Sequence, residues 1–121
     1  MTEQDYGESI LDSVKESLGI VSEDVDFDTQ LIMHINSIFA VLHQIGIGPT
    51  EPFSIYDSDA TWGDFIGDEA VIMNVKSYMY ARVRLIFDPP SSSFVLDSLQ
   101  KLSDEMEWRL NVAADHSDKL D

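Results

Sequence analysis

The sequence predicts an all-α fold, a small bundle of about four helices with a long irregular loop between the second and third main helices. Two observations predict it. Apolar residues recur at helical spacing in several segments, and serine, glycine or proline stands at the ends of these segments, where helices begin and end. The stretch from Thr50 to Gly67 lacks that spacing, so it is expected to be the loop.

The composition bounds the class of protein. The chain has 121 residues, of which 44% are hydrophobic, so one folded domain is expected and a disordered acidic tail is excluded. There is no cysteine, which excludes a disulfide framework and a thiolate metal site. No apolar run approaches the roughly 18 residues needed to cross a bilayer, and the acidic start is no signal peptide. No membrane is therefore expected as a partner.

Charge is the strongest compositional signal. The chain has 23 Asp and Glu against 7 Lys and Arg, which gives a net charge of −16. Duplex DNA, RNA and anionic membranes would be repelled, so they are poor direct partners. Solubility is the ordinary explanation of such acidity. An acidic surface also suits a place where DNA must pass without binding.

The first predicted helix is short. Ser9 can cap its start, and Gly19 stands where a glycine commonly ends a helix. Its apolar stripe consists of Ile10, Leu11, Val14 and Leu18.

The connector that follows is crowded with acids. Asp24, Asp26 and Asp28 alternate like the opening of a calcium loop, but Thr29 takes the place of the required glycine. Ile35 likewise takes the place of the bidentate glutamate, so a calcium site is excluded. The three aspartates are instead expected to cap the next helix and to favour its positive N-terminal end.

The second main helix is predicted from about Thr29 to Ile45, and the glycines and proline of residues 46–49 end it. His34 and His43 lie nine residues apart on opposite sides of this helix, so they cannot share a metal ion. Each is expected at the surface or its boundary. The inward residues are Leu31, Ile35, Ile38, Val41, Leu42 and Ile45.

The predicted loop is rich in aromatic residues. Thr61 can cap a single helical turn within it. A long loop with this much aromatic area either packs over the core or waits for a partner, and the sequence leaves both open. Its candidates for partner contact are Phe53, Tyr56, Trp62 and Phe65.

The third main helix, Val71–Phe87, is unusually apolar. Its large apolar residues cover an arc of roughly 200°, twice the ~100° stripe of a surface helix. It is therefore expected to be covered from two sides, by its own domain or by a neighbouring subunit. Arg82 falls inside this arc, and Arg84 comes two residues later. A guanidinium in such an apolar setting needs a carboxylate or carbonyl partner. Either a buried ion pair within the fold or a contact at a subunit interface satisfies that need.

The last helix has a different character. Pro89 and Pro90 stop the preceding helix, and one of the three serines at 91–93 can cap the new one. Trp108 lies nearly opposite the apolar stripe, among charged residues, which suits a contact with a partner protein or a fold over its own helix. The helical domain is predicted to span residues 1–111, followed by a flexible polar tail over 112–121. The stripe consists of Val95, Leu99, Leu102, Met106 and Leu110.

Catalysis finds no support in the sequence. No Ser/His/Asp or Cys/His motif is recognisable, and no pair of carboxylates stands at helical spacing inside an apolar stripe. Asp57 and Asp59 only partly match a calcium loop. We therefore expect no enzyme, no cofactor and no metal site.

Several segments together resemble a known family. They are HINSIFAVLHQIGIGP (residues 34–49), the Trp62-Gly63 turn, VKSYMYARVRLIFDPPSSSFV (75–95) and EWRLN (107–111). This pattern is similar to the head–tail connector family of long-tailed bacteriophages, also called head-completion or adaptor proteins. The most specific part runs from Tyr80 to Pro90, together with the late EWRLN. The resemblance extends from the first helix to Asn111.

The resemblance implies a structural virion protein, made in the host cytoplasm and placed in the neck between head and tail. Its subunits are expected to form a ring, a dodecamer in this family, that binds under the portal protein and extends the DNA channel. The ring would provide a platform for a stopper or tail-completion protein, and DNA would pass through it without specific binding. Trp108 and Arg109 are the expected contacts to the portal or another partner.

An alternative from another class remains open. A small acidic protein-binding module, such as a DNA mimic or an anti-repressor, would also be acidic and compact. A connector subunit should form rings, alone or with the portal, whereas such a module should remain small.

Overall fold

The computed structural model describes residues 7–120, and it describes side chains for residues 7–115. The fold is all-α, as predicted, and the described residues contain no strand. One isolated bridge pairs Ser9 with Thr61. The helices are α2 (Ile10–Ser17), α3 (Asp28–Ile45), α4 (Trp62–Phe65), α5 (Glu69–Phe87) and α6 (Ser93–Leu120).

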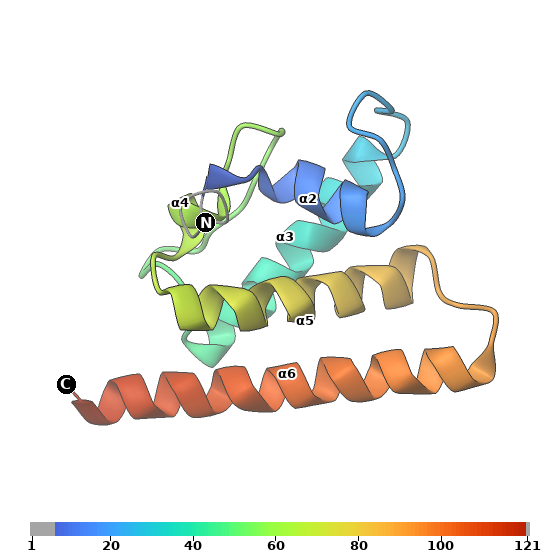
Figure 1. The fold of residues 1–121 in the computed structure, drawn as a ribbon. Coiled ribbons are helices and arrows are strands. Elements are labelled where there is room, and N and C mark those ends of the chain that lie inside the picture. The colour runs from blue at the N-terminus through green and yellow to red at the C-terminus, as the bar shows by residue number, and fades with distance from the viewer. Residues whose placement is uncertain (1–6, 121) are drawn as a thin grey trace.

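Helix α5 is the central element. Figure 1 shows α6 running along one side of α5, while α2, α4 and the loops lie on the other side and α3 crosses it. Helix α5 is thus covered from two sides within its own chain, as its wide apolar arc predicts. Ile72, Val75, Tyr78, Met79 and Val83 are fully buried. Ile86, at the end of the arc, remains 51% exposed.

Helix α2 begins and ends as predicted. The Ser9 hydroxyl accepts a hydrogen bond from the Asp12 amide at 3.2 Å, and Gly19 has a left-handed φ of 80°. The polar side of the helix includes an unexpected buried residue, Lys15, which is 1% exposed. Its ammonium group donates to the Ser22 carbonyl at 2.9 Å and pairs with the Asp28 carboxylate at 2.9 Å. Lys15 therefore ties the connector and the start of α3 to α2.

The predicted capping of α3 by the connector aspartates is wrong. The N-cap residue is Phe27, and no side chain caps the helix. Asp24 accepts a hydrogen bond from the Asp26 amide within the connector, and Asp28 pairs with Lys15. Asp28 nevertheless lies in the first turn, where a negative charge is favourable. Gly46 ends the helix with a φ of 102°, as predicted.

The long loop packs over the core. Asn36 of α3 accepts from the Ile55 amide at 2.8 Å and donates to the Ile55 carbonyl at 2.9 Å, which fastens the loop to the helix. Thr61 and Asp64 form a reciprocal capping box around α4. Gly48 is required because a Cβ there would lie 2.5 Å from the Phe65 ring and its φ is 101°.

Helix α6 differs from the prediction at both ends. Ser92 supplies the cap, accepting from the Val95 amide at 3.4 Å, but Val95 itself is exposed. Figure 1 shows that α6 begins beyond the end of α5. The predicted end at Asn111 is also wrong, since the helix continues to Leu120. Ala114 explains part of this, because it extends the buried stripe and its Cβ lies against Gly46.

Candidate partner-contact surfaces

The described residues hold no obvious chemical centre. No group of three or more His, Cys, Asp or Glu among them could hold a metal ion. No described helix is long and apolar enough to cross a membrane. The site residues predicted from the sequence lie on α5, on α6 and in the long loop with α4.

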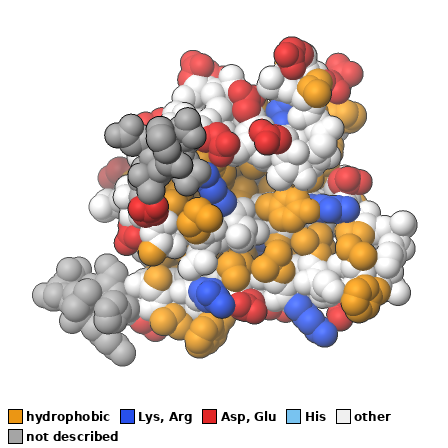
Figure 2. All heavy atoms as spheres, viewed as in Figure 1, with side chains coloured by type: hydrophobic (Ala, Val, Ile, Leu, Met, Phe, Trp, Pro, Cys, Tyr) orange, Lys and Arg blue, Asp and Glu red, His pale blue; other side chains and the backbone are white. Residues whose placement is uncertain are grey.

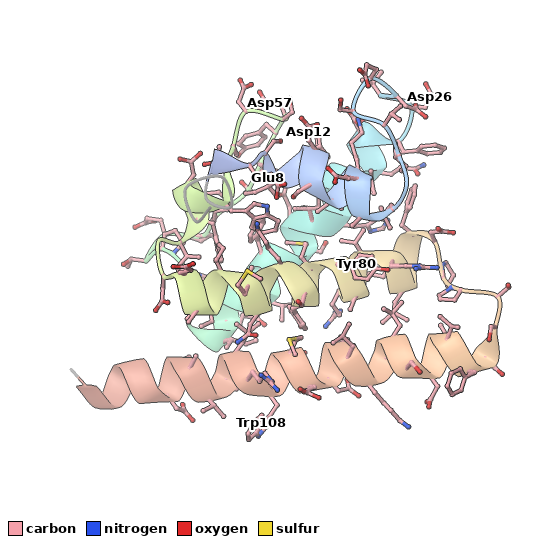
Figure 3. All side chains as sticks on the ribbon, viewed as in Figure 1. Glu8, Asp12, Asp26, Asp57, Tyr80 and Trp108 are labelled. Atoms are coloured by element: carbon pink, nitrogen blue, oxygen red, sulfur yellow. The ribbon has the colours of Figure 1, made fainter. Side chains whose placement is uncertain are left out.

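Trp108 projects from the outer side of α6. It is 66% exposed, and Figure 3 shows its side chain pointing away from α5. The neighbouring Arg109 pairs with Glu105 one turn earlier, at 2.7 Å, and both side chains are about half exposed. Such a surface pair contributes little to folding stability, so Arg109 could exchange its carboxylate partner at small cost. Trp108 and Arg109 together form an available contact surface.

A second apolar surface, which was not predicted from the sequence, lies where α5 turns into α6. Phe94 is 78% exposed, with Ile86, Val95 and Leu96 also exposed nearby in sequence. Three consecutive apolar residues directly after the capping serines were the available signal. An open hollow at this corner is lined by Leu85, Ser93, Leu96, Asp97 and Gln100.

Arg82 has its partners within its own chain. Its Nη1 donates to the Tyr78 hydroxyl at 2.8 Å and lies 3.5 Å from the Glu107 carboxylate. Tyr78 in turn donates to Glu107 at 2.7 Å, which joins α5 to α6. Burial and the hydrogen bond to Glu107 raise the pKa of Tyr78 to about 12. The Arg82 side chain is 31% exposed, so this ion pair is only partly buried.

Arg84 is in a different situation. Its Nη1 donates to the Tyr80 hydroxyl at 2.9 Å, and it forms no ion pair with any described residue. Its Nε is buried and has no hydrogen-bond partner. The hydrogen bond to Tyr80, with a smaller contribution from the charge of Asp88, raises the pKa of the guanidinium above its ordinary value.

Of the loop candidates, only Tyr56 is available to a partner. Trp62 and Phe65 are 2% and 3% exposed, and Phe53 is partly buried against Phe65 with ring centroids 5.2 Å apart. These three belong to the core, because the loop packs on α3. Tyr56 is 82% exposed, and the Ser54 hydroxyl donates to it.

The α2–α5 hollow is an open space of about 380 Å³ between these helices. Lys76 closes one side, paired with Glu8 at 3.4 Å and lying over the Trp62 ring. Figure 3 shows Tyr80 on the side of α5 that faces α2, where it lines this hollow. The other lining residues are Ser13, Val14, Glu16, Ser17 and Ser77.

Charge is distributed unevenly over the molecule. Figure 2 shows acidic side chains over α2 and the loops, and apolar patches along α5 and α6. We call the side formed by α2, the connector of residues 18–27 and the loop of residues 46–61 the acidic side. Figure 3 labels four of its carboxylates, and all of them lie away from α6. Lys15, the one lysine or arginine in residues 7–68, is buried, so the segments that form this side contribute no exposed cation. Glu8 is paired with Lys76 of α5. The acidic side comprises Glu8, Asp12, Glu16, Glu23, Asp24, Asp26, Asp57 and Asp59.

Comparison with known proteins identifies a family. Neither the curated proteins nor the solved structures gave a match. The family model described as phage connector protein matches residues 10–117, which include all of α2 to α5 and most of α6. A match over this much of the chain also agrees with the resemblance found in its sequence. The chain belongs to the phage connector protein family.

Proposed function

We propose that this protein is the adaptor subunit of a head–tail connector. Copies form a ring, expected to be a dodecamer, which binds under the portal protein in the virion neck and extends the DNA channel. The ring then provides a platform for a stopper or tail-completion protein. Family membership supports a structural role at the head–tail connection, and the exposed outer side of α6 supports docking on another protein.

The single observation that carries the docking proposal is Trp108. A tryptophan that is 66% exposed on a well-packed helix contributes little to its own fold, whereas tryptophan is favoured at the centre of protein interfaces. Trp108 would bury aromatic area against the portal, and Arg109 would present its guanidinium fork to a portal carboxylate.

The acidity fits a passage for DNA. With a net charge of −16, the surface repels the phosphate backbone, so DNA would move through the channel without being held. The isolated protein should therefore show no duplex binding at physiological salt in a gel-shift assay. A salt-sensitive shift at micromolar protein would overturn the proposed channel lining.

The test mixes the purified protein with the portal protein of the same phage and measures complex mass and symmetry by mass photometry and electron microscopy. The expected result is a ring stacked on the portal. Trp108→Ala should weaken portal binding about 30-fold or more while the circular dichroism spectrum stays unchanged. Met33→Ala is the matched control, because it removes a 60% exposed apolar side chain from α3, where no contact residue is predicted.

The outcomes separate the two classes of function. A protein that stays small with the portal present, and instead binds a basic protein, would overturn the adaptor proposal in favour of an acidic binding module. If rings form on the portal and Trp108→Ala binds normally, the adaptor function stands and the contact surface lies elsewhere.

A further inference from the structure

Among the described side chains, each lysine and arginine except Arg84 has a carboxylate within 4 Å in its own chain. The pairs are Lys15–Asp28 at 2.9 Å, Lys76–Glu8 at 3.4 Å, Arg82–Glu107 at 3.5 Å, Lys101–Asp97 at 3.1 Å and Arg109–Glu105 at 2.7 Å. In a chain with 23 acids against 7 Lys and Arg, a cation without a carboxylate partner is unexpected. Arg84 is that exception.

The surroundings of Arg84 leave most of its hydrogen-bonding capacity unused. A guanidinium has five N–H donors, and the bond from Nη1 to the Tyr80 hydroxyl is its one hydrogen bond to the described residues. The Nε donor is buried without a partner, which costs free energy in the isolated subunit. The side chain is only partly buried, so a group from outside can approach it. The fold therefore positions the Arg84 guanidinium but leaves some of its hydrogen-bond donors without a partner.

A carboxylate is the group that fits this position. Arginine binds carboxylates through paired, charge-assisted hydrogen bonds, and these are stronger than its bond to a neutral hydroxyl. Asp88 is near enough for its charge to act on Arg84, but it does not form an ion pair with it. The fold thus supplies no carboxylate partner to Arg84 from the described part of the chain.

The acidic side of a second copy offers the complementary charge. Its carboxylates, such as Asp12, Glu16 and Asp57, have no surface lysine or arginine among residues 7–68 to offset them. Two copies that each carry a net charge of −16 repel one another, so a cation at the meeting surface favours a contact between them. Arg84 is the described cation that can supply it without breaking an ion pair of its own chain.

We propose that Arg84 forms an intersubunit ion pair with a carboxylate on the acidic side of a second copy of this protein. The proposal rests on the proposed function, in which copies assemble side by side. It also distinguishes the two arginines named by the sequence: Arg82 joins α5 to α6 within one subunit, and Arg84 joins one subunit to the next.

The test measures assembly of the full chain by mass photometry and sedimentation velocity, alone and with the portal. Arg84→Gln should weaken association of copies about tenfold or more, since one charge-assisted contact is lost, while the melting temperature stays close to that of the wild type. The difference in association affinity between Arg84→Gln and the wild type should become smaller as the salt concentration rises from about 0.05 M to about 0.5 M. Lys101→Gln makes the same change of charge at a 78% exposed side chain of α6 and should assemble normally.

Two further variants separate the contact from local packing. Tyr80→Phe removes the internal hydrogen bond of Arg84 but keeps its charge, so assembly should be retained. Arg84→Lys decides the case in which Arg84→Gln fails to fold. Because lysine keeps the charge and lacks the fork, a weakened but still salt-dependent assembly supports the contact, and an unchanged affinity overturns it.

The remaining outcomes are also distinct. If wild-type copies assemble and Arg84→Gln matches them, the proposed ion pair is wrong and the adaptor function is untouched. If Arg84→Gln assembles normally but no longer binds the portal, the carboxylate belongs to the portal and the second-copy proposal is wrong. If the wild type forms no multi-copy assembly even on the portal, the proposed function fails, and the ion pair fails with it.

Discussion

The aromatic residues of the long loop and those of α6 are of the same types but have opposite environments. Trp62 and Phe65 of the loop region are 2% and 3% exposed, whereas Phe94 and Trp108 of α6 are 78% and 66% exposed. The loop has one helical turn, α4, which carries Trp62 and Phe65, and it supplies part of the core. Helix α6 is regular and yet leaves its largest side chains in solvent. Regular secondary structure is therefore no guide to which aromatic residues stabilise this fold.

The difference has a physical cause in what lies opposite each residue. The rings of Phe53 and Phe65 lie 5.0 Å and 4.7 Å from the Phe39 ring of α3, so the loop completes a cluster that α3 begins. The Trp62 indole also donates to the Ser13 hydroxyl of α2 at 2.9 Å, which satisfies its polar atom on burial. No described element lies over Trp108. The same substitution, tryptophan to alanine, should therefore lower the free energy of unfolding strongly at buried Trp62 and only slightly at exposed Trp108.

The largest effect is expected for Trp62→Ala. Removing a fully buried indole leaves a cavity between α2, α3 and α5 and the Ser13 hydroxyl without its donor, so the free energy of unfolding should fall by about 4 kcal/mol. Urea denaturation followed by circular dichroism measures it. A loss below about 1 kcal/mol would show that the loop is not fastened to the core, and the comparison with α6 would fail.

The next largest effect is expected for Gly48→Ala, which strains the start of the loop. The new methyl group would lie 2.5 Å from the Phe65 ring, and the backbone has a φ of 101°. Steric and backbone costs together should lower the free energy of unfolding by about 3 kcal/mol. Gly19→Ala is the matched control: its φ is 80°, but a Cβ there has no neighbour within 4 Å. It should cost only about 1 kcal/mol, and an equal loss in both variants would exclude the clash with Phe65.

Much of this fold could be predicted from local chemistry. The caps at Ser9 and Thr61, the glycine end at Gly46 and the double-proline stop before α6 all depend on residues near in sequence, and the structure confirms them. The missing aspartate cap of α3 depends on Lys15, thirteen residues before Asp28, whose burial no helical spacing indicates. Prediction from neighbouring residues failed where a contact depends on a residue that is distant in sequence.

The candidate sites show the same limit. The helical wheel correctly placed Trp108 away from the apolar stripe, because spacing along one helix determines it. It could not distinguish Arg82 from Arg84, since the partner of Arg82 is Glu107 on another helix. It also placed Val95 inward, because the wheel does not show that α6 begins beyond the cover of α5. Exposure at the ends of helices needs the tertiary structure.

A pH-dependent prediction concerns the inner side of α6, where Glu107 holds Tyr78. Because the folded state raises the pKa of Tyr78 from 10.0 to about 12, it favours the protonated phenol. The resulting stabilisation, on the order of 2 kcal/mol, is complete below about pH 10 and is lost as pH rises to about 12. Denaturation at several pH values should show a smaller loss in Tyr78→Phe than in the wild type over this window. Parallel losses in the two proteins would mean that Tyr78 ionises freely in the fold.

The smallest effect on folding is expected for Trp108→Ala, because the Trp108 side chain points away from α5 (Figure 3). Since the indole is 66% exposed, the free energy of unfolding should change by less than about 0.5 kcal/mol.

The two tryptophans make the comparison measurable by fluorescence. Trp108→Ala leaves only buried Trp62 and should emit at short wavelength until it unfolds. Trp62→Phe leaves only Trp108, which should emit at long wavelength alone and shift to shorter wavelength when the portal covers it. A short-wavelength emission from Trp108 in the free protein, or a stability loss close to that of Trp62→Ala, would show that α6 buries Trp108 against its own chain, and the outer side of α6 would then lose its main contact residue.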